Sequence, residues 1–216
     1  MFFDGMPGDW RPLPLAQAAQ RYDLGEASYD SVHLADLFGD EPEHFHVHSG
    51  DLVVDGPLAL GNMPGEDEDT VYVVDGDLTV HGPLGFRNLD VYTSLYVTGT
   101  VAAHDLVCLW DSCLFVGGSL HVGGLLATSL TDAGHLVVKD RLTCPIWLDD
   151  RGRGAIYVDP EPGTRFLGAP DNPLRPADAP AEDIAAALRA EFLAEQGHVD
   201  VDEIHRAVLA GRPVLR

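Results

Sequence analysis

The stretch YVVDGDLTV, residues 72–80, contains the phrase that decides the fold: a small residue, any residue, leucine, any residue and valine. Nearly the same phrase occurs six times between residues 50 and 158, and in every copy the valine follows the leucine position by two residues. An internal repeat of this kind is the signature of a solenoid, in which each copy adds one structural unit. The leucine position is filled by Leu52, Leu78, Leu95, Leu120, Leu136 and Ile156.

The repeat predicts strands that are buried on one face. Side chains two residues apart point to the same side of a strand, so leucine and valine face inward while the residue between them faces water. The segments between copies lack the long helical pattern that would join parallel strands through helices. We therefore predict an all-β fold, a right-handed parallel β-helix of about six turns over residues 44–168, with equivalent residues stacked in columns.

The flanking segments are expected to cover the open ends of this coil, since unpaired strand edges invite other chains. Residues 1–43 form an N-terminal cap segment, with helical character at Pro14–Tyr22 and Ser31–Phe38. Residues 169–179 form a proline-rich linker, and residues 180–216 form a helical extension. The extension contains two expected helices, residues 180–196 and about 202–210, which proline, acidic residues and glycine delimit.

Composition restricts the partners. The 216 residues contain 35 acidic and 13 basic residues, for a net charge of −22. Nucleic acid and membrane surfaces are disfavoured because their negative charge would repel the protein, whereas a basic protein would be attracted. The alternative is that the acidity only secures solubility. Three cysteines without a paired framework, no long apolar run and no signal-peptide pattern predict a cytoplasmic location.

Acidic residues supply the candidate binding site. Asp51 and Asp77 precede the leucine position in two adjacent turns and are expected to stack about 5 Å apart on the outer face. Asp55 and Asp75 lie near the same corners. Paired carboxylates also suit general acid–base chemistry or calcium binding. However, serine and histidine replace aspartate in later copies, and no other catalytic motif is present, so we expect no enzyme activity.

A second acidic group lies in the longest turn. Its four consecutive residues form either a solvated loop or a docking point for a basic partner. Together with Asp51, Asp55, Asp75 and Asp77, they make up the predicted partner-binding set. The four residues are Glu66, Asp67, Glu68 and Asp69.

Histidines and cysteines give no clear site. His44, His46 and His48 alternate on one strand and could ligate a metal, but the spacing to an acidic ligand does not fit a known motif. The remaining histidines of the coil, including His81 and His104, are expected to fall in different columns. We therefore expect no metal and no cofactor.

The cysteines and large aromatic residues are expected to be structural. Cys108, Cys113 and Cys144 have no neighbour in sequence that marks a nucleophile. Three aromatic residues form either an exposed binding patch or packing beneath a long turn. They are Tyr96, Trp110 and Trp147.

Two segments, YVVDGDLTV and GGSLHVGG (residues 117–124), resemble the bactofilins, polymer-forming cytoskeletal β-helix proteins of bacteria. The chain also resembles small acidic bacterial β-helix proteins, some of which accompany polymorphic toxins as immunity proteins. The resemblance covers about residues 44–160. It implies a β-helix that either self-associates as a scaffold or neutralises a basic toxin, while the unequal turns and the helical extension depart from the bactofilin pattern.

These observations predict a non-catalytic, cytoplasmic β-helix that binds a basic protein through its acidic face, such as an immunity protein for a basic toxin. A self-associating scaffold and a carbohydrate-active or metal-binding β-helix are the alternatives.

Overall fold

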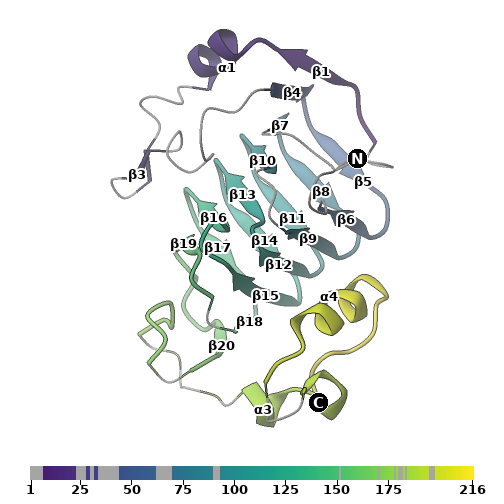
Figure 1. Ribbon diagram of the computed structural model, residues 1–216, viewed down its shortest axis with the longest axis vertical. Coiled ribbons are helices and arrows are strands. Elements are labelled where there is room, and N and C mark those ends of the chain that lie inside the picture. The colour runs from purple at the N-terminus through teal and green to yellow at the C-terminus, as the bar shows by residue number, and fades with distance from the viewer. Residues whose placement is uncertain are drawn as a thin grey trace.

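The chain forms a parallel β-solenoid of about five turns with short helices at both ends of the sequence, as a computed structural model shows (Figure 1). The predicted parallel β-helix is confirmed, with about five turns rather than six. The structure describes residues 7–22, 28–29, 32–33, 44–61, 70–89, 93–150, 152–169, 171–177, 179, 182, 184–194 and 198–216.

Each of five complete turns contributes one strand to each of three sheets. The seven-stranded sheet contains β1 (Trp10–Leu13), β4 (His44–Ser49), β7 (Thr70–Asp75), β10 (Thr93–Val97), β13 (Cys113–Val116), β16 (His135–Val138) and β19 (Ala155–Tyr157). The five-stranded sheet contains β5 (Leu52–Val54), β8 (Leu78–Val80), β11 (Val101–Ala103), β14 (Leu120–Val122) and β17 (Leu142–Thr143). The six-stranded sheet contains β6 (Leu58–Leu60), β9 (Leu84–Asn88), β12 (Leu106–Trp110), β15 (Leu125–Leu130), β18 (Ile146–Asp149) and β20 (Arg165–Leu167). β1 precedes the five complete turns, and β19 and β20 follow them.

The six leucine positions of the repeat belong to two columns, which corrects the single column that the sequence suggests. Leu52, Leu78 and Leu120 lie on the five-stranded sheet, where Val101 pairs with both Leu78 and Leu120. The other three copies lie on the seven-stranded sheet. They are Leu95, Leu136 and Ile156. Both columns point into one interior cluster of leucine and valine, so each copy still buries its apolar face.

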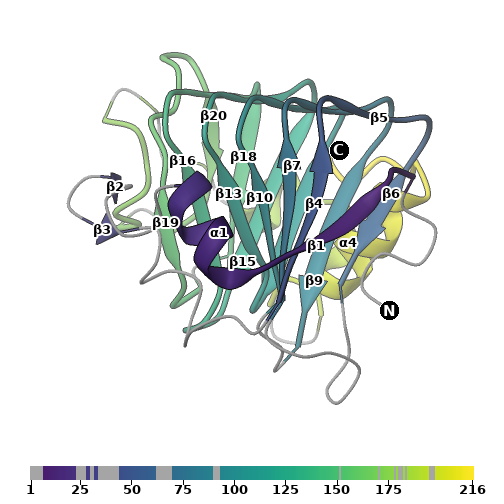
Figure 2. The same cartoon turned by 90° about the horizontal axis from the view of Figure 1, so that it is seen from above.

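The N-terminal segment covers the first edge of the seven-stranded sheet. β1 pairs antiparallel with β4, whereas every other pairing in the coil is parallel among the described residues. The helix α1 (Leu15–Arg21) follows, and its Ala18 joins Tyr22 in a cluster with outward residues of that sheet, such as Val73 and Phe115. Figure 2 shows β1 and α1 in front of the strands of the coil at this end. Within Ser31–Phe38, residues Val32–His33 form a strand, β3, which pairs with β2 (Ser28–Tyr29), so the expected helix is wrong there.

The C-terminal extension covers a side of the coil rather than its end. Its elements are α3 (Ile184–Ala187), a 3₁₀ helix η1 (Ala190–Phe192) and α4 (Val201–Leu209). Phe192, Ile204 and Val208 pack against outward residues of the six-stranded sheet, including Val107 and Leu148. The single helix expected over residues 180–196 is therefore wrong, since Arg189 is extended between two short helical segments. The helix expected near 202–210 is confirmed as α4.

Residues of the proline-rich stretch pack against the last turn of the coil. Leu174 and Ala179 contact the interior cluster. The amide of Asn172 donates a 2.6 Å hydrogen bond to the buried carboxylate of Asp149, which also accepts one of 2.6 Å from Thr128. This stretch is therefore part of the packed body and covers the C-terminal end of the interior.

Candidate functional site

The outer face of the five-stranded sheet is the one that the described N- and C-terminal elements leave uncovered, because α1 packs on the seven-stranded sheet and α4 on the six-stranded sheet. Each of its short strands points one residue outward, and Val53 is 54% exposed. The outward column consists of Val53, Thr79, Ala102, His121 and Thr143.

The first corner, between the seven- and five-stranded sheets, brings Asp51 and Asp77 together as the sequence predicts. The backbone N–H of Asp77 donates a 2.9 Å hydrogen bond to Oδ1 of Asp51. The backbone N–H of Thr100 donates one of 2.7 Å to Oδ1 of Asp77. Each carboxylate therefore holds the next turn in place. Gly76 fits between them because a Cβ there would lie 2.7 Å from Oδ1 of Asp51.

The other predicted aspartates have separate partners. Asp75 forms an ion pair with Arg21 of α1 and accepts a 3.4 Å hydrogen bond from the hydroxyl of Thr98. Asp55 lies at the second corner, between the five- and six-stranded sheets, and its Oδ1 lies 3.0 Å from Nδ1 of His81. Asp51, Asp75 and Asp77 thus share the first corner, while Asp55 lies across the face from them. Residues 66–69 lie outside the described part of the chain.

The second corner contains a histidine pair that the sequence analysis missed. Val54, Val80 and Ala103 pair in register, so the residues that follow them, Asp55, His81 and His104, occupy one column. The expectation that these histidines fall in different columns is therefore wrong. Nδ1 of His104 lies 2.8 Å from Oδ2 of Asp105.

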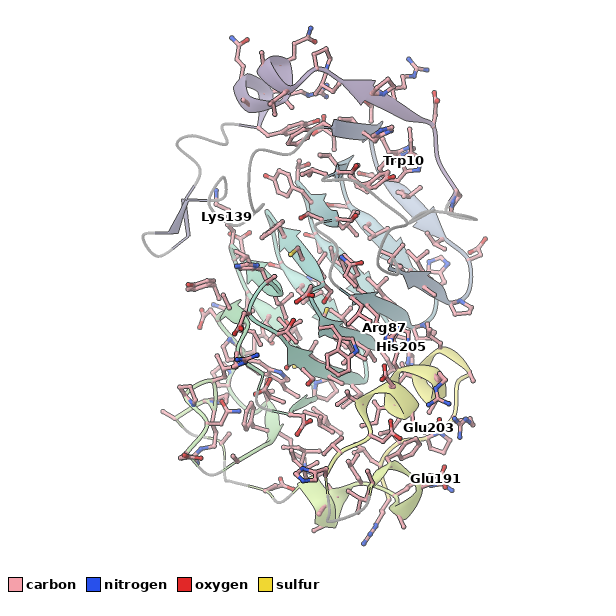
Figure 3. The ribbon with its side chains drawn as sticks, in the orientation of Figure 1. Trp10, Arg87, Lys139, Glu191, Glu203 and His205 are labelled. Atoms are coloured by element: carbon pink, nitrogen blue, oxygen red, sulfur yellow. The ribbon has the colours of Figure 1, made fainter. Side chains whose placement is uncertain are left out.

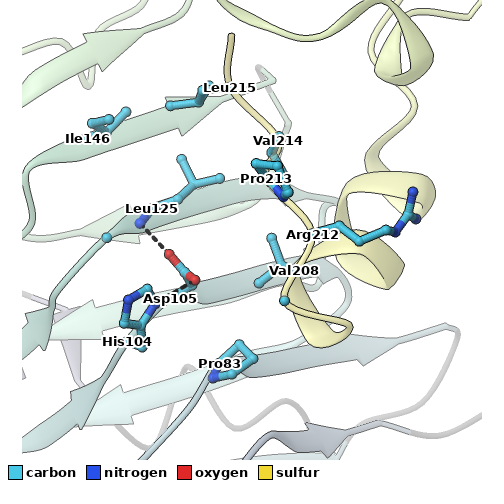
Figure 4. Close-up of a pocket in the computed structure, with 12 residues that line it drawn as sticks. Pro83, His104, Asp105, Leu125, Ile146, Val208, Arg212, Pro213, Val214 and Leu215 are labelled. Atoms are coloured by element: carbon cyan, nitrogen blue, oxygen red, sulfur yellow. Dashed lines mark hydrogen bonds and ion pairs between the residues drawn. The ribbon is translucent and has the colours of Figure 1, made fainter.

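A pocket of about 400 Å³ opens beside His104, between the coil and the C-terminal tail (Figure 4). Its apolar walls include Leu125, Ile146 and Val208, and Arg212 lies at its edge. This volume falls within the range of about 300–1,000 Å³ that small-ligand pockets occupy. Oδ1 of Asp105 accepts a 2.6 Å hydrogen bond from the backbone N–H of Leu125, which fixes the carboxylate in the wall.

The three cysteines are buried and unsuited to nucleophilic chemistry. Burial raises the pKa of Cys108, Cys113 and Cys144 to about 12, so the thiols stay protonated at neutral pH. Nδ1 of His135 lies 3.7 Å from the Cys113 sulfur but 2.9 Å from the carbonyl oxygen of Ala133. The imidazole therefore hydrogen-bonds the backbone, and burial lowers its pKa.

The large aromatic residues pack inside the structure rather than forming an exposed patch. Trp147 is fully buried and donates a 3.0 Å hydrogen bond to the Thr128 hydroxyl. Tyr96 is 8% exposed, and Trp110 is partly buried against the C-terminal extension. The exposed patch that the sequence suggested is therefore wrong, and the three residues pack in three separate clusters rather than beneath one long turn.

The histidine strand β4 also serves packing. Nδ1 of His48 accepts a 3.1 Å hydrogen bond from the backbone N–H of Asp9, and the ring of His46 lies 5.3 Å from that of Tyr72. Among the described residues, no group of three or more histidine, cysteine or acidic side chains is placed to hold a metal ion. No helix in the described ranges is both long and apolar enough to cross a membrane.

No family model, curated protein or solved structure matches this chain.

Proposed function

We propose that this protein is a non-catalytic, cytoplasmic binding protein that presents the outer face of its five-stranded sheet to a basic protein partner. The observation that carries the proposal is the uncovered face itself, bordered by Asp51 and Asp77 on one corner and Asp55 on the other, in a chain of net charge −22. A rigid face with acidic borders attracts a basic partner by long-range steering and gives it a fixed surface to dock on.

The local chemistry favours binding over catalysis. General acid–base work needs a carboxylate that is free to exchange a proton with a substrate. One oxygen of Asp51 and one of Asp77 already accept backbone N–H groups of the coil. The buried thiols are protonated at neutral pH. These features support a structural role for the two aspartates and the three cysteines rather than a catalytic one.

The sharper form of the proposal is neutralisation of a basic toxin, such as a nuclease. It rests on the acidity of the chain and on its resemblance to small acidic β-helix proteins that accompany toxins. Residues Glu66–Asp69 would add to the same negative field.

Two double variants with equal net charge test the role of the face. Asp51→Asn with Asp77→Asn removes two charges at the first corner but keeps an oxygen acceptor for each backbone N–H. Asp132→Asn with Glu191→Gln removes two charges away from this face, at side chains that are 68% and 47% exposed. We expect the immobilised native protein to capture a basic protein from extracts of its host cells, and only the corner variant to bind it several-fold more weakly.

The proposal is wrong if both double variants bind the captured protein as the native chain does, or if both lose binding equally. Equal loss would indicate a general effect of charge rather than a defined face.

A self-associating scaffold is the second candidate, favoured by the strand edges. Within the described ranges, β5 and β6 have no partner strand on the N-terminal side and β19 has none on the C-terminal side. Such edges can accept strands from another copy.

A further inference from the structure

His205 on α4 occupies a space that a glycine leaves open in the coil. A Cβ at Gly85 of β9 would lie 2.5 Å from Nε2 of His205, so any side chain at that position would displace the imidazole. Nε2 is buried and has no hydrogen-bond partner. A buried Nε2 without a partner is tolerated more readily when it is unprotonated than when it carries a hydrogen. A buried N–H without an acceptor carries the full cost of its desolvation.

The charged groups that face His205 would not accommodate a second proton. They are Arg87 from β9 and Asp202 and Arg206 from α4. Figure 3 shows Arg87 and His205 together where α4 meets the coil. The carboxylate of Asp202 already accepts a 2.9 Å hydrogen bond from Arg87 and one of 3.4 Å from the Trp110 indole.

We propose that the C-terminal extension is docked on the coil through neutral His205, and that α4 loosens from the six-stranded sheet when this histidine takes up a proton. The guanidinium groups of Arg87 and Arg206 would repel an imidazolium, and its new N–H at Nε2, close to Gly85, would have no acceptor. When α4 is released, the imidazolium is hydrated by water instead.

The direction of the pH dependence follows from linkage. Burial, and then the positive charges of Arg87 and Arg206, lower the pKa of His205 below its ordinary value of 6.5 while α4 is docked. In the released helix the imidazole returns to the ordinary value, so the released state binds the proton more readily. Docking is therefore at full strength above pH 6.5 and weakens as the pH falls below it. The docking equilibrium constant falls by up to about tenfold per pH unit until the docked pKa is passed.

Release of α4 uncovers an apolar surface. Ile204, Ala207 and Val208 leave their contacts with outward residues of the six-stranded sheet, such as Val107 and Leu109. Acidification would thus convert a covered side of the coil into an exposed apolar one, which a hydrophobic dye can detect.

Hydrogen exchange read by mass spectrometry tests the proposal on the full chain, with rates at each pH normalised to an unstructured reference peptide. Between pH 7.5 and pH 5.5 we expect the amides of residues 201–209 to lose protection, while those of β13 and β14 keep theirs. In His205→Gln the helix should keep the same protection at both pH values. His198→Gln, which alters an exposed histidine just before α4, should behave as the native chain does.

A second variant keeps the test decisive if His205→Gln fails to dock. Arg206→Gln removes one of the positive charges beside the imidazole, so its loss of protection on acidification should be smaller than that of the native chain. The proposal is overturned if native α4 keeps constant protection down to pH 5.5, if a docked His205→Gln chain loses protection as the native one does, or if Arg206→Gln leaves the pH dependence unchanged.

Discussion

Single carboxylates hold the corners of this coil, and Asp77 is the clearest case. Its Oδ1 accepts the backbone N–H of Thr100 from the next turn. We expect Asp77→Ala to lower the free energy of unfolding by about 1 kcal/mol, because that N–H loses its acceptor. Asp77→Asn keeps an amide oxygen in place and should cost less than half as much. Urea denaturation followed by circular dichroism measures both, and equal losses in the two variants would contradict a hydrogen-bonding role for Asp77.

The cysteines give a second prediction at the scale of the residue. Their pKa of about 12 means that thiolate is scarce in the folded protein at pH 8, and burial also blocks access by a reagent. We expect a chromogenic disulfide reagent to react very slowly with the native chain and to modify all three thiols after denaturation in urea. Fast reaction of any one thiol in the folded state would show that the site is open.

At the scale of the element, β1 protects the edge of the seven-stranded sheet. It pairs antiparallel with β4 and contains Pro12, which has no N–H to offer a further strand, and Arg11, whose side chain is 79% exposed. Removing residues 1–13 should expose β4, and we expect the molar mass of that variant to rise with concentration in light scattering. Arg11→Ala retains the strand and serves as the control; if the truncated chain stays monomeric, β1 is not what prevents association.

The repeat predicts the strands of the coil but not the sheet to which each strand belongs. The phrase of glycine, leucine and valine predicts a strand with one buried face and one face in water, and the copies on β5, β8 and β14 have that form. The prediction of a wet face is wrong for Tyr96 and Val137, which are buried in the cluster with Ala18 and Tyr22. The phrase does not say on which sheet a copy lies, because any strand that follows a corner meets the same requirement. Leu95 therefore lies on the seven-stranded sheet and Leu78 on the five-stranded one. For the same reason, the sequence did not show that His81 and His104 share a column. Docking of α4 against β9 depends on contacts between distant residues, which no local pattern encodes.

At the scale of the whole molecule, β1 covers the seven-stranded sheet at one end, and Leu174 and Ala179 pack against the interior at the other, so we predict a particle that does not polymerise. We expect light scattering at physiological salt to give one molar mass over a wide concentration range. A mass that grows with concentration would mean that the edges of β5, β6 or β19 accept strands, and the scaffold function would then replace the binding function.

The charge of the molecule was readable from composition, but its distribution was not. Asp75 is tied to Arg21, which lies 54 residues away in sequence. Asp51 and Asp77 point one oxygen each into the backbone of a neighbouring turn. A count of acidic residues predicts the sign of the field around the protein, whereas the pairing of each carboxylate decides how much of it reaches a partner.

The position of α4 on the coil has a consequence for synthesis on the ribosome. All three sheets are complete by Leu167, yet the residues that cover the outer side of β12 and β18 come later in the chain, between Leu188 and Val214. In a nascent coil, Val107 and Leu148 would be exposed to solvent until these residues emerge. We expect this interval to be when the chain is most prone to aggregation and most dependent on chaperones.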